Sequence, residues 1–351
     1  MKVGIMTLPL HTNYGGILQA WALQTIIERM GHESSHVFRH LLGPLCVYEG
    51  RTPEEIKAIQ GNCDRFVDRY IRCDETPVAE IAPDRYDALV VGSDQIWRHL
   101  CDTLLLVPFT TAFLDFAENW NVKRIAYAPS FGIDRWEAPE EMIPRCSELL
   151  KKFDAVSCRE LSGAAICRDV LGVEAKTVVD PTLLLGRDDY SALIDAAETE
   201  TPAGTLMSYV LDRDAEKQRL IDAIAARHGL TPYYANAKPE DNSAPIAERI
   251  QPPVEQWLRD FRDSKMVITD SFHATVFSIL FGKPFVVTGN PWRGLSRLES
   301  LLKQLGLEDH LVLRADDFTP DGDYGVPPSA YEKLDALRRD AMDFLSAALK
   351  D

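Results

Sequence analysis

The sequence has no C-x-x-C pair, no long hydrophobic run and no excess of positive charge. Its seven cysteines lie scattered along the first half of the 351 residues. This odd number and irregular spacing exclude a disulfide framework and a zinc ribbon, and they are typical of proteins from a reducing cytosol. The most apolar segment, residues 272–287, is interrupted by His273, Lys283 and Pro284. It is therefore too short and too polar to cross a bilayer.

Positive charge is scarce. Lysine and arginine number 38 against 54 aspartates and glutamates, which gives a formal net charge of −16. An acidic surface repels the phosphates of nucleic acids and anionic lipids, so we expect no nucleic-acid partner. Any anionic ligand must instead be held by a few local cations.

A secretory signal is also missing from the first residues. They carry one lysine and a short apolar run that stops at His11, whereas a signal peptide needs a longer apolar region. We therefore expect a cytoplasmic protein. With 46% hydrophobic and 26% charged residues, the composition is that of a folded globular chain, and its length predicts about two domains.

Short apolar runs alternate with amphipathic segments in both halves of the chain, which is typical of βαβ units and parallel sheets. We predict an α/β fold with two Rossmann-like domains, residues 1–186 and 187–330. Residues 331–351 are expected to form a C-terminal helix that is able to pack back on the N-terminal domain. The expected strands are residues 2–9, 87–91, 124–127, 155–157, 177–179, 206–211, 231–234, 266–269 and 284–288. The expected helices are residues 17–30, 139–153, 160–171, 215–228, 254–262, 272–281 and 331–349.

Unusual polar clusters follow the expected strands. In open α/β sheets, ligands bind outside the carboxyl ends of the strands. Two such sheets facing each other would form one interdomain cleft lined by these clusters. The clusters are HTNYGG (11–16), GSDQIW (92–97), APSFG (128–132), CRE (158–160), DPT (180–182) and DSFH (270–273).

The first two clusters suggest recognition of an anion or of hydroxyl groups. HTNYGG joins a strand to a helix, so its backbone N–H groups are candidates for holding an anion, although a simple tight turn would look the same. In GSDQIW, three polar residues and a tryptophan suit hydroxyl recognition beside an aromatic platform, whereas the alternative is a helix cap. The candidate residues are Asn13, Tyr14, Gly15, Gly16, Ser93, Asp94, Gln95 and Trp97.

Arg159 follows an expected strand at the expected start of a helix. Its planar guanidinium could meet a carboxylate or phosphate, and the helix dipole would favour the same anion. A surface ion pair with Glu160 is the alternative interpretation.

The segment DSFHATVFSILFGKPF (270–285) is the most informative part of the sequence. Its helix is apolar on nearly every side and is therefore expected to be buried. Asp270 or Ser271 can cap the helix, which leaves His273 in the first turn. The positive end of the helix dipole favours a neutral imidazole, suited to act as a base or a hydrogen-bond donor. Lys283 lies beyond the far end of this helix.

A metal site is not expected. His32, His36 and His40 are spaced as metal ligands would be on one helix face, but Gly31 ends the preceding helix. The Asp-rich stretch 316–323 lacks the ligand order of a calcium loop and is interpreted as a solvated turn.

Taken together and in this order, the clusters resemble the polysaccharide pyruvyl transferase family. The similarity runs through NYGGILQAWAL, VVGSDQIW, YAPSFG, SCRE, VVDPTLLL and ITDSFHATVFSILFGKPF, and so covers nearly the whole chain. The resemblance implies a GT-B-like fold with the active site between two domains. It also implies transfer of pyruvate from phosphoenolpyruvate, the donor substrate, to two hydroxyls of a sugar, giving a cyclic ketal and phosphate. No metal or organic cofactor is required.

The resemblance assigns roles to several residues. His273 matches the family's histidine at the reacting groups, with Asp94 or Asp270 expected to support it, and Arg159 matches the donor-binding arginine. Many members have an arginine two residues before the histidine, where this chain has Ser271. Arg293 and Arg297 are expected to hold the donor in place of that arginine, and Ser271 and Lys283 are further candidates for donor binding.

Two alternatives compete with this interpretation. A GT-B nucleotide-sugar glycosyltransferase would need a carboxylate for the ribose, for which Glu255, Asp260 and Glu299 are the loose candidates. A non-catalytic sugar-binding protein would give no reason for a histidine at a helix start beside arginines. The expected partner of the enzyme is a sugar or polysaccharide-precursor acceptor, and a lipid-linked acceptor would bring peripheral contact with a membrane.

Overall fold

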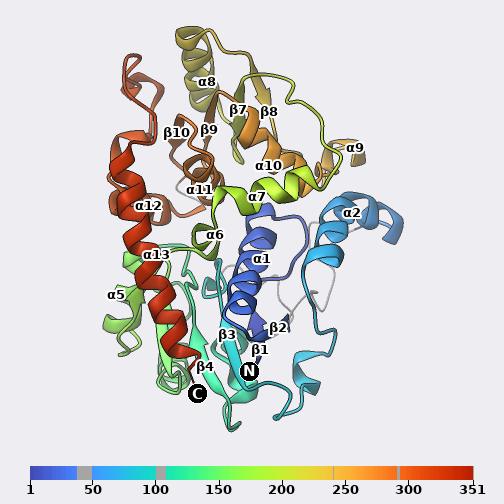
Figure 1. The fold of residues 1–351 in the computed structure, drawn as a ribbon, viewed down its shortest axis with the longest axis vertical. Helices are drawn as coiled ribbons and strands as arrows, with labels where there is room; N and C mark the ends of the chain where they lie inside the picture. The colour runs from blue at the N-terminus through green and yellow to red at the C-terminus, as the bar shows by residue number, and fades with distance from the viewer. Residues whose placement is uncertain (38–49, 100–107, 240, 291–292, 351) are drawn as a thin grey trace. The chain divides into compact units, whose positions relative to one another are not determined.

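The computed structural model describes most of the chain, drawn as a coloured ribbon in Figure 1. The described residues are 1–37, 50–99, 108–239, 241–290 and 293–350.

The chain divides into two compact units, each built on one parallel β-sheet. The path crosses between units more than once, because segments from late in the sequence belong to the first unit. Unit 1 comprises Met1–Leu184, Glu240–Ser243 and Ala336–Asp351, and unit 2 comprises Leu185–Pro239 and Ala244–Asp335.

The sheet of unit 1 has six strands in the order β2-β1-β3-β4-β5-β6, and every strand pairing is parallel. Its central strand β3 has the sequence ALVV and is fully buried, as expected for a parallel strand covered on both faces. The strands are β1 Lys2–Met6, β2 Glu33–His36, β3 Ala88–Val91, β4 Lys123–Ala126, β5 Ala155–Cys158 and β6 Lys176–Thr177.

Helices of unit 1 connect these strands. The side chain of Asn13 caps the helix that follows β1, and the chain leaves that helix through Gly31, whose φ is 87°. The next helix begins with a capping box between Thr52 and Glu55. The helices are α1 Tyr14–Arg29, α2 Pro53–Tyr70, α4 Ile143–Leu150, α5 Leu161–Asp169 and α6 Pro181–Leu184, with 3₁₀ turns at Val78–Glu80, Phe109–Phe113, Asp115–Ala117 and Glu140–Met142.

The sheet of unit 2 has five parallel strands in the order β11-β10-β9-β7-β8. The strands are β7 Leu206–Tyr209, β8 Pro232–Tyr234, β9 Met266–Thr269, β10 Phe285–Thr288 and β11 Leu311–Val312. The helices are α7 Arg187–Asp195, α8 Ala215–His228, α9 Ile246–Arg249, α10 Val254–Asp263, α11 Phe272–Leu280 and α12 Leu295–Leu305, with 3₁₀ turns at Glu308–His310 and Ala315–Asp317.

The last helix, α13 (Pro328–Ala348), begins in unit 2 and ends in unit 1. At its start, the Tyr331 hydroxyl donates to the carbonyl of Ile279. Towards its end, Lys176 Nζ donates to the carbonyl of Asp340, 3.1 Å away, and the Phe344 ring lies 6.4 Å from that of Tyr127. Each half of α13 is therefore anchored within its own unit.

The α/β fold with two Rossmann-like domains is confirmed, whereas the cleft expected between the domains stays a prediction. Helix α8 and strand β9 occupy the residues predicted for them. The predicted helix 139–153 begins instead as a 3₁₀ turn and becomes α4 only at Ile143. Strand β2 was not predicted, because its sequence ESSH has no apolar run.

His36 lies on the strand β2, so His32 and His36 do not share one face of a helix. Burial lowers its pKa to about 4. His40 lies outside the described residues. Among the residues that are described, no three metal-ligating side chains gather as a metal site would require. Within the same residues, no helix combines the length and apolarity needed to cross a membrane.

Gly92 ends β3 in a conformation that other residues rarely adopt, with φ of 125°. A Cβ atom here would lie 2.0 Å from the carbonyl oxygen of Tyr127, which follows β4. The absence of a side chain therefore lets the loop after β3 pass against the neighbouring strand.

We expect Gly92→Ala to destabilise the protein by about 2–4 kcal/mol, because both the φ angle and the contact with Tyr127 are unfavourable. Gly61, inside α2, has nothing within 4 Å of the position that an added methyl group would take, so Gly61→Ala should stabilise by about 0.5–1 kcal/mol. Urea unfolding followed by circular dichroism compares the two variants. Equal stability of Gly92→Ala and the wild type would contradict this account.

Candidate functional site

In both units, the polar clusters gather where strands end. Parallel strands place their carboxyl ends at one edge of a sheet, so residues that follow different strands become neighbours there. Unit 1 brings together the residues after β3, β5 and β6, and unit 2 those after β7, β9 and β10.

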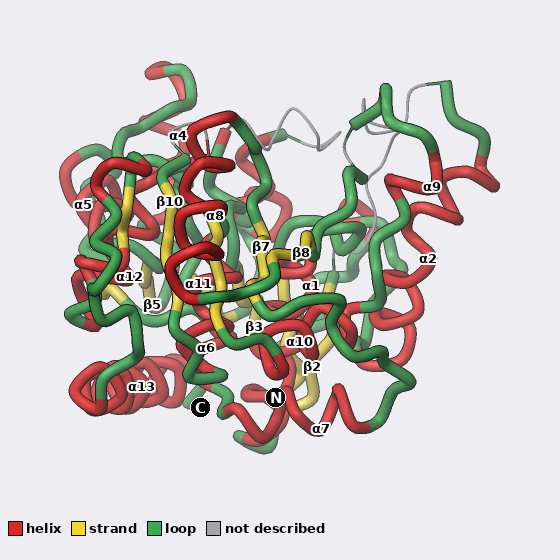
Figure 2. Tube along the Cα trace, turned by 90° about the horizontal axis from the view of Figure 1, so that it is seen from above, coloured by secondary structure: helices red, strands yellow, loops and turns green. Residues whose placement is uncertain are grey.

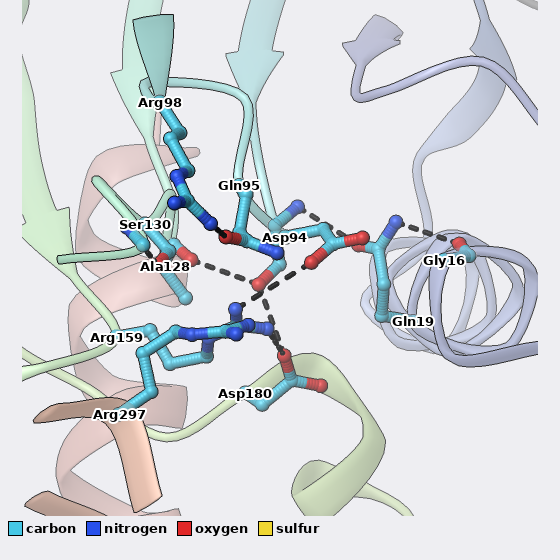
Figure 3. Close-up of polar contacts among 12 residues, drawn as sticks. Gly16, Gln19, Asp94, Gln95, Arg98, Ala128, Ser130, Arg159, Asp180 and Arg297 are labelled. Carbon is cyan, nitrogen blue, oxygen red and sulfur yellow. Dashed lines mark hydrogen bonds and ion pairs between the residues drawn. The ribbon is translucent and has the colours of Figure 1, made fainter. Parts of the chain in front are cut away.

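Arg159 is the centre of the polar cluster in unit 1 (Figure 3). Its Nη1 donates to Asp180 Oδ2 at 2.7 Å, and its Nη2 lies 3.5 Å from Asp94 Oδ1. All three side chains are almost completely buried. The ion pairs therefore join the loops that follow β3, β5 and β6.

Burial by itself lowers the pKa of Arg159. The carboxylates of Asp180, Asp94 and Glu160 outweigh burial, so the pKa lies above its ordinary value and the guanidinium stays charged. Asp180 and Asp94, which contact Arg159, together carry more negative charge than one guanidinium can neutralise. An anionic donor would have to compete with both of them for Arg159, so the geometry favours a role for Arg159 in positioning Asp94.

Ser93 belongs to the same buried network. Its backbone N–H donates to Gln19 Oε1 at 2.9 Å, and its Oγ lies 2.8 Å from the carbonyl oxygen of Ala128 and 3.1 Å from Asp180 Oδ2. The side chain is fully buried. Ser93 is therefore placed to hold the loop after β3, not to meet an acceptor hydroxyl.

Asn13 links the start of α1 to Asp94. Its Oδ1 accepts from the N–H of Gly16 at 3.2 Å, and its Nδ2 donates to Asp94 Oδ2 at 3.3 Å. Asp94 has a φ of 59°, a left-handed conformation that aspartate tolerates better than most residues. Asn13 is exposed, whereas its three neighbours are buried: Tyr14, Gly15 and Gly16.

Trp97 corrects the expectation of an aromatic platform. Its indole N–H donates to the carbonyl of Ala112 at 2.9 Å, and its ring stacks on Phe113 with centroids 5.2 Å apart. Only 1% of the residue is exposed, so the ring belongs to the core. Gln95 remains partly exposed and accepts a hydrogen bond from Arg98.

Glu160 is buried and not at the surface as considered from the sequence, although its charge helps to raise the pKa of Arg159. Its Oε1 accepts from Ser130 Oγ at 3.0 Å and from the N–H of Phe131 at 2.9 Å. It therefore fixes the loop APSFG that follows β4.

Asp270 is the corresponding centre in unit 2. Its carboxylate accepts four hydrogen bonds and is 3% exposed. These come from the N–H groups of Leu211 (2.7 Å) and Asp212 (3.3 Å), from Lys217 Nζ (2.9 Å) and from Asn290 Nδ2 (2.9 Å). These hydrogen bonds join the loops that follow β7, β9 and β10, so the geometry supports a structural role for Asp270, and its catalytic role stays a prediction.

His273 is the second residue of α11, directly beyond β9 and Asp270. It is 6% exposed, and its ring packs edge-on against that of Phe272, with centroids 5.3 Å apart. Ser271 is the N-cap of this helix, because its hydroxyl accepts from the N–H of Ala274. Many members of the family that this sequence resembles have an arginine at position 271, whereas Ser271 caps the helix here.

Arg293 follows β10 at the same edge and forms a two-pronged ion pair with Asp212. Its Nε and Nη2 lie 2.7 and 3.2 Å from the two carboxylate oxygens. These hydrogen bonds lower the pKa of Asp212 against the opposing effect of burial. Arg297 is more buried and donates to the carbonyl of Arg293. Arg293, 38% exposed in its side chain, is the more accessible of the two cations.

Lys283 is not brought to this edge. It lies between the end of α11 and the start of β10, which is the amino end of the sheet. Burial, and then the charge of Arg187, lowers its pKa. This position gives no support to its predicted role in donor binding, since α11 spans the sheet between Lys283 and His273.

Several partners of the predicted residues were missed. Asp180 lies in a cluster that the sequence marked, DPT, but its contact with Arg159 had no sequence signal. Lys217 sits in a helix whose sequence AEKQRL is typical of a solvated face, so its burial against Asp270 was not foreseeable. Asn290 follows β10 as a single polar residue without a motif.

Comparison with known proteins bears on these residues. Residues 13–291 match the sequence model of the family described as polysaccharide pyruvyl transferase. The matched range includes Asp94, Arg159, Asp180, Asp270 and His273. None of the curated proteins compared with this chain matches its sequence.

Solved structures are similar over nearly the whole chain. A candidate UDP-N-acetylglucosamine 2-epimerase from Listeria monocytogenes has 13% identity and a TM-score of 0.50, covering 99% of this chain and 90% of that one. The UDP-GlcNAc 2-epimerase of Neisseria meningitidis has 10% identity, covers 97% and 100%, and has a TM-score of 0.45. MurG of Acinetobacter baumannii has 10% identity, covers 99% and 94%, and has a TM-score of 0.44. The first similarity confirms the GT-B-like fold expected from the sequence.

We expect Asp180→Ala to destabilise the protein by about 3–5 kcal/mol, because it leaves the buried Arg159 without its closest carboxylate. Asp169→Ala removes an exposed ion pair with Arg168 and should cost at most about 1 kcal/mol. Thermal and urea unfolding of both variants measures the difference. If the two variants lost the same small stability, the buried ion pairs would not organise this edge.

Proposed function

This chain belongs to the polysaccharide pyruvyl transferase family, and we propose that it transfers pyruvate from phosphoenolpyruvate to two hydroxyl groups of a sugar. The products would be a cyclic ketal and inorganic phosphate. Membership of the family makes the protein a transferase that acts in the pyruvylation of polysaccharides. That phosphoenolpyruvate is the donor and that a cyclic ketal is the product are our proposals.

The observation that carries the proposal is the position of His273. It opens a buried helix at the carboxyl edge of the sheet in unit 2, where α/β proteins bind their ligands. An imidazole can accept and return a proton near neutral pH, which the reaction requires twice. The motif around it is the one in which the family resemblance is most extensive.

Arg293 supports an anionic donor. Phosphoenolpyruvate carries a carboxylate and a phosphate, and both are best met by charge-assisted hydrogen bonds. Ser271 caps α11 and supplies no charge, so a cation must come from another segment. Arg293 follows the adjacent strand β10 at the same edge and is partly exposed. We assign to Arg293 the binding of the anionic donor, which an arginine at position 271 would otherwise provide.

The proposed chemistry balances with these groups. Protonation of the methylene carbon of phosphoenolpyruvate gives an oxocarbenium-like centre at C2, which a sugar hydroxyl attacks while losing its proton. Phosphate then leaves with the C2–O bond electrons, and a second hydroxyl adds to C2 and loses its proton. His273 is proposed to supply the first proton and to accept one from a hydroxyl. This scheme requires no metal or organic cofactor.

The acceptor is proposed to be a polysaccharide precursor met in the cytoplasm. Scattered cysteines without a disulfide framework support a reducing compartment. A lipid-linked precursor would place the reaction at a membrane surface.

We expect His273→Gln to reduce phosphate release from phosphoenolpyruvate by at least about a hundredfold, since glutamine keeps a hydrogen-bonding side chain but cannot exchange a proton. His228→Gln changes an exposed histidine at the end of α8 and should retain full activity. Donor binding by His273→Gln should persist. Unchanged turnover in this variant would remove His273 from the mechanism.

Phosphoenolpyruvate should stabilise the protein against heat, whereas UDP, GDP and CMP should not. At ~100 times its dissociation constant, a ligand stabilises by roughly 2.7 kcal/mol. Arg293→Gln should diminish the shift with phosphoenolpyruvate, and Arg219→Gln, a change at an exposed arginine of α8, should leave it intact. A shift with a nucleotide alone would favour the glycosyltransferase alternative over pyruvyl transfer.

A further inference from the structure

A second group of polar residues lies at the carboxyl edge of the same sheet in unit 2, after β7 and β8. The guanidinium of Arg213 lies over the ring of Tyr234, with its carbon 3.5 Å from the ring centroid. Tyr234 is the last residue of the edge strand β8 and is 45% exposed. Figure 2 shows β7 and β8 next to each other, with α8 beside them. We name Arg213, Tyr234 and Asn236 the edge cluster.

The edge cluster is held in place by hydrogen bonds. Arg213 Nη2 donates to Asn236 Oδ1 at 3.1 Å, and Asn236 Nδ2 donates to the carbonyl of Val210 at 3.2 Å. The Tyr234 hydroxyl donates to Gln218 Oε1 on α8 at 3.0 Å. Stacking and hydrogen bonds thus fix the guanidinium before any ligand arrives, which reduces the entropy lost on binding.

The charge of Arg213 distinguishes it from other arginines of the described chain. Arg293, Arg219 and Arg227 each contact a carboxylate, whereas the contacts described for Arg213 are with a tyrosine and an amide. Burial lowers the pKa of Arg213 from its ordinary value, and the effect of Tyr234 only partly opposes this. An anion from outside the chain would offset that cost.

The two acidic neighbours of Arg213 in sequence are engaged elsewhere. Asp212 pairs with Arg293, and Asp214 caps α8 by accepting from the N–H of Lys217. Within the described residues, neither carboxylate forms an ion pair with Arg213. The cation is therefore kept available in a protein of net charge −16.

The distance to His273 suits an extended substrate. In the strand order β10-β9-β7-β8, the edge strand β8 is two strands away from β9, which leads into His273. Neighbouring strands are about 4.8 Å apart, so the two ends are separated by roughly 10 Å along one edge. A chain of linked sugars can span this separation, whereas a single molecule of phosphoenolpyruvate cannot.

We propose that the edge cluster is an acceptor subsite for a sugar residue that carries an anionic group, a carboxylate or a phosphate, next to the residue that receives pyruvate. Arg213 pairs with the anion through its planar fork, and the exposed part of the Tyr234 ring packs against the apolar face of the sugar. The inference rests on the proposed function, because it specifies the acceptor of the same reaction. It makes the acceptor an acidic polysaccharide precursor.

Calorimetric titration of the full chain tests this subsite without turnover. The probes are a disaccharide containing a uronic acid, the methyl ester of the same disaccharide, the corresponding sugar phosphate, and UDP. We expect the acid to bind about tenfold more tightly than its ester, since the ester removes only the charge. Preference for the phosphate over the acid identifies a phosphorylated sugar as the source of the anion. Equal affinity for acid and ester together with weak phosphate binding overturns the proposal, as does binding of UDP alone.

Variants then assign the charge to one residue. Arg213→Gln should lose the preference for the charged sugar, and Arg213→Lys should retain part of it. Arg219→Gln removes the same charge from exposed α8 and should keep the full preference. Retention of the preference in Arg213→Gln would overturn the assignment. Thermal unfolding verifies that each variant is folded.

Phosphate release from phosphoenolpyruvate separates this inference from the proposed function. With an acidic acceptor, Arg213→Gln should raise the acceptor KM about tenfold and leave kcat unchanged, because Arg213 binds and takes no part in proton transfer. If charged sugars bind through Arg213 but no phosphate is released, the subsite stands and the proposed donor fails. If phosphate is released equally with neutral and acidic acceptors, the proposed function stands and the subsite fails.

Discussion

A buried carboxylate must be satisfied by hydrogen-bond donors, and this constraint organises the carboxyl edge of both sheets. In unit 1, Asp180 accepts hydrogen bonds from Arg159 and Ser93. In unit 2, Asp270 accepts hydrogen bonds from Lys217, Asn290 and two backbone N–H groups. The chain segments so joined follow different strands whose carboxyl ends lie at the same edge of the sheet, and the buried acids hold them together there. Removing the donors from either acid would leave an ion without solvation, which is among the most costly defects in a folded protein.

Much of the fold could be predicted because parallel strands and buried helices have strong apolar patterns. The helix that opens with Phe272 and His273 was predicted from its sequence alone, and Ser271 proved to be its cap. What could not be predicted depends on tertiary context. Trp97 looked like an exposed platform because it follows polar residues, yet the sheet places it in the core. Lys217 looked solvated, because a helix sequence does not reveal which polar residue faces a buried acid.

The arginines show three different uses of one side chain. Arg159 is buried between Asp94 and Asp180, and its charge holds these two carboxylates in position. Arg293 shares its charge with a half-exposed aspartate beside the proposed donor site. Arg213 rests on an aromatic ring and an amide. In an acidic protein, the functional meaning of a cation therefore depends less on its presence than on whether a carboxylate of the chain already neutralises it.

Helix α13 has a consequence for the order in which the chain can fold. Unit 1 includes residues on both sides of unit 2 in the sequence, and its last segment lies within the final residues of the chain. Because residues of unit 2 lie between the parts of unit 1, unit 1 cannot receive the later half of α13 until the whole sequence of unit 2 has been synthesised. Until then, the apolar side chains of unit 1 that α13 contacts stay uncovered. One of them is the Tyr127 ring, which Phe344 contacts in the folded protein.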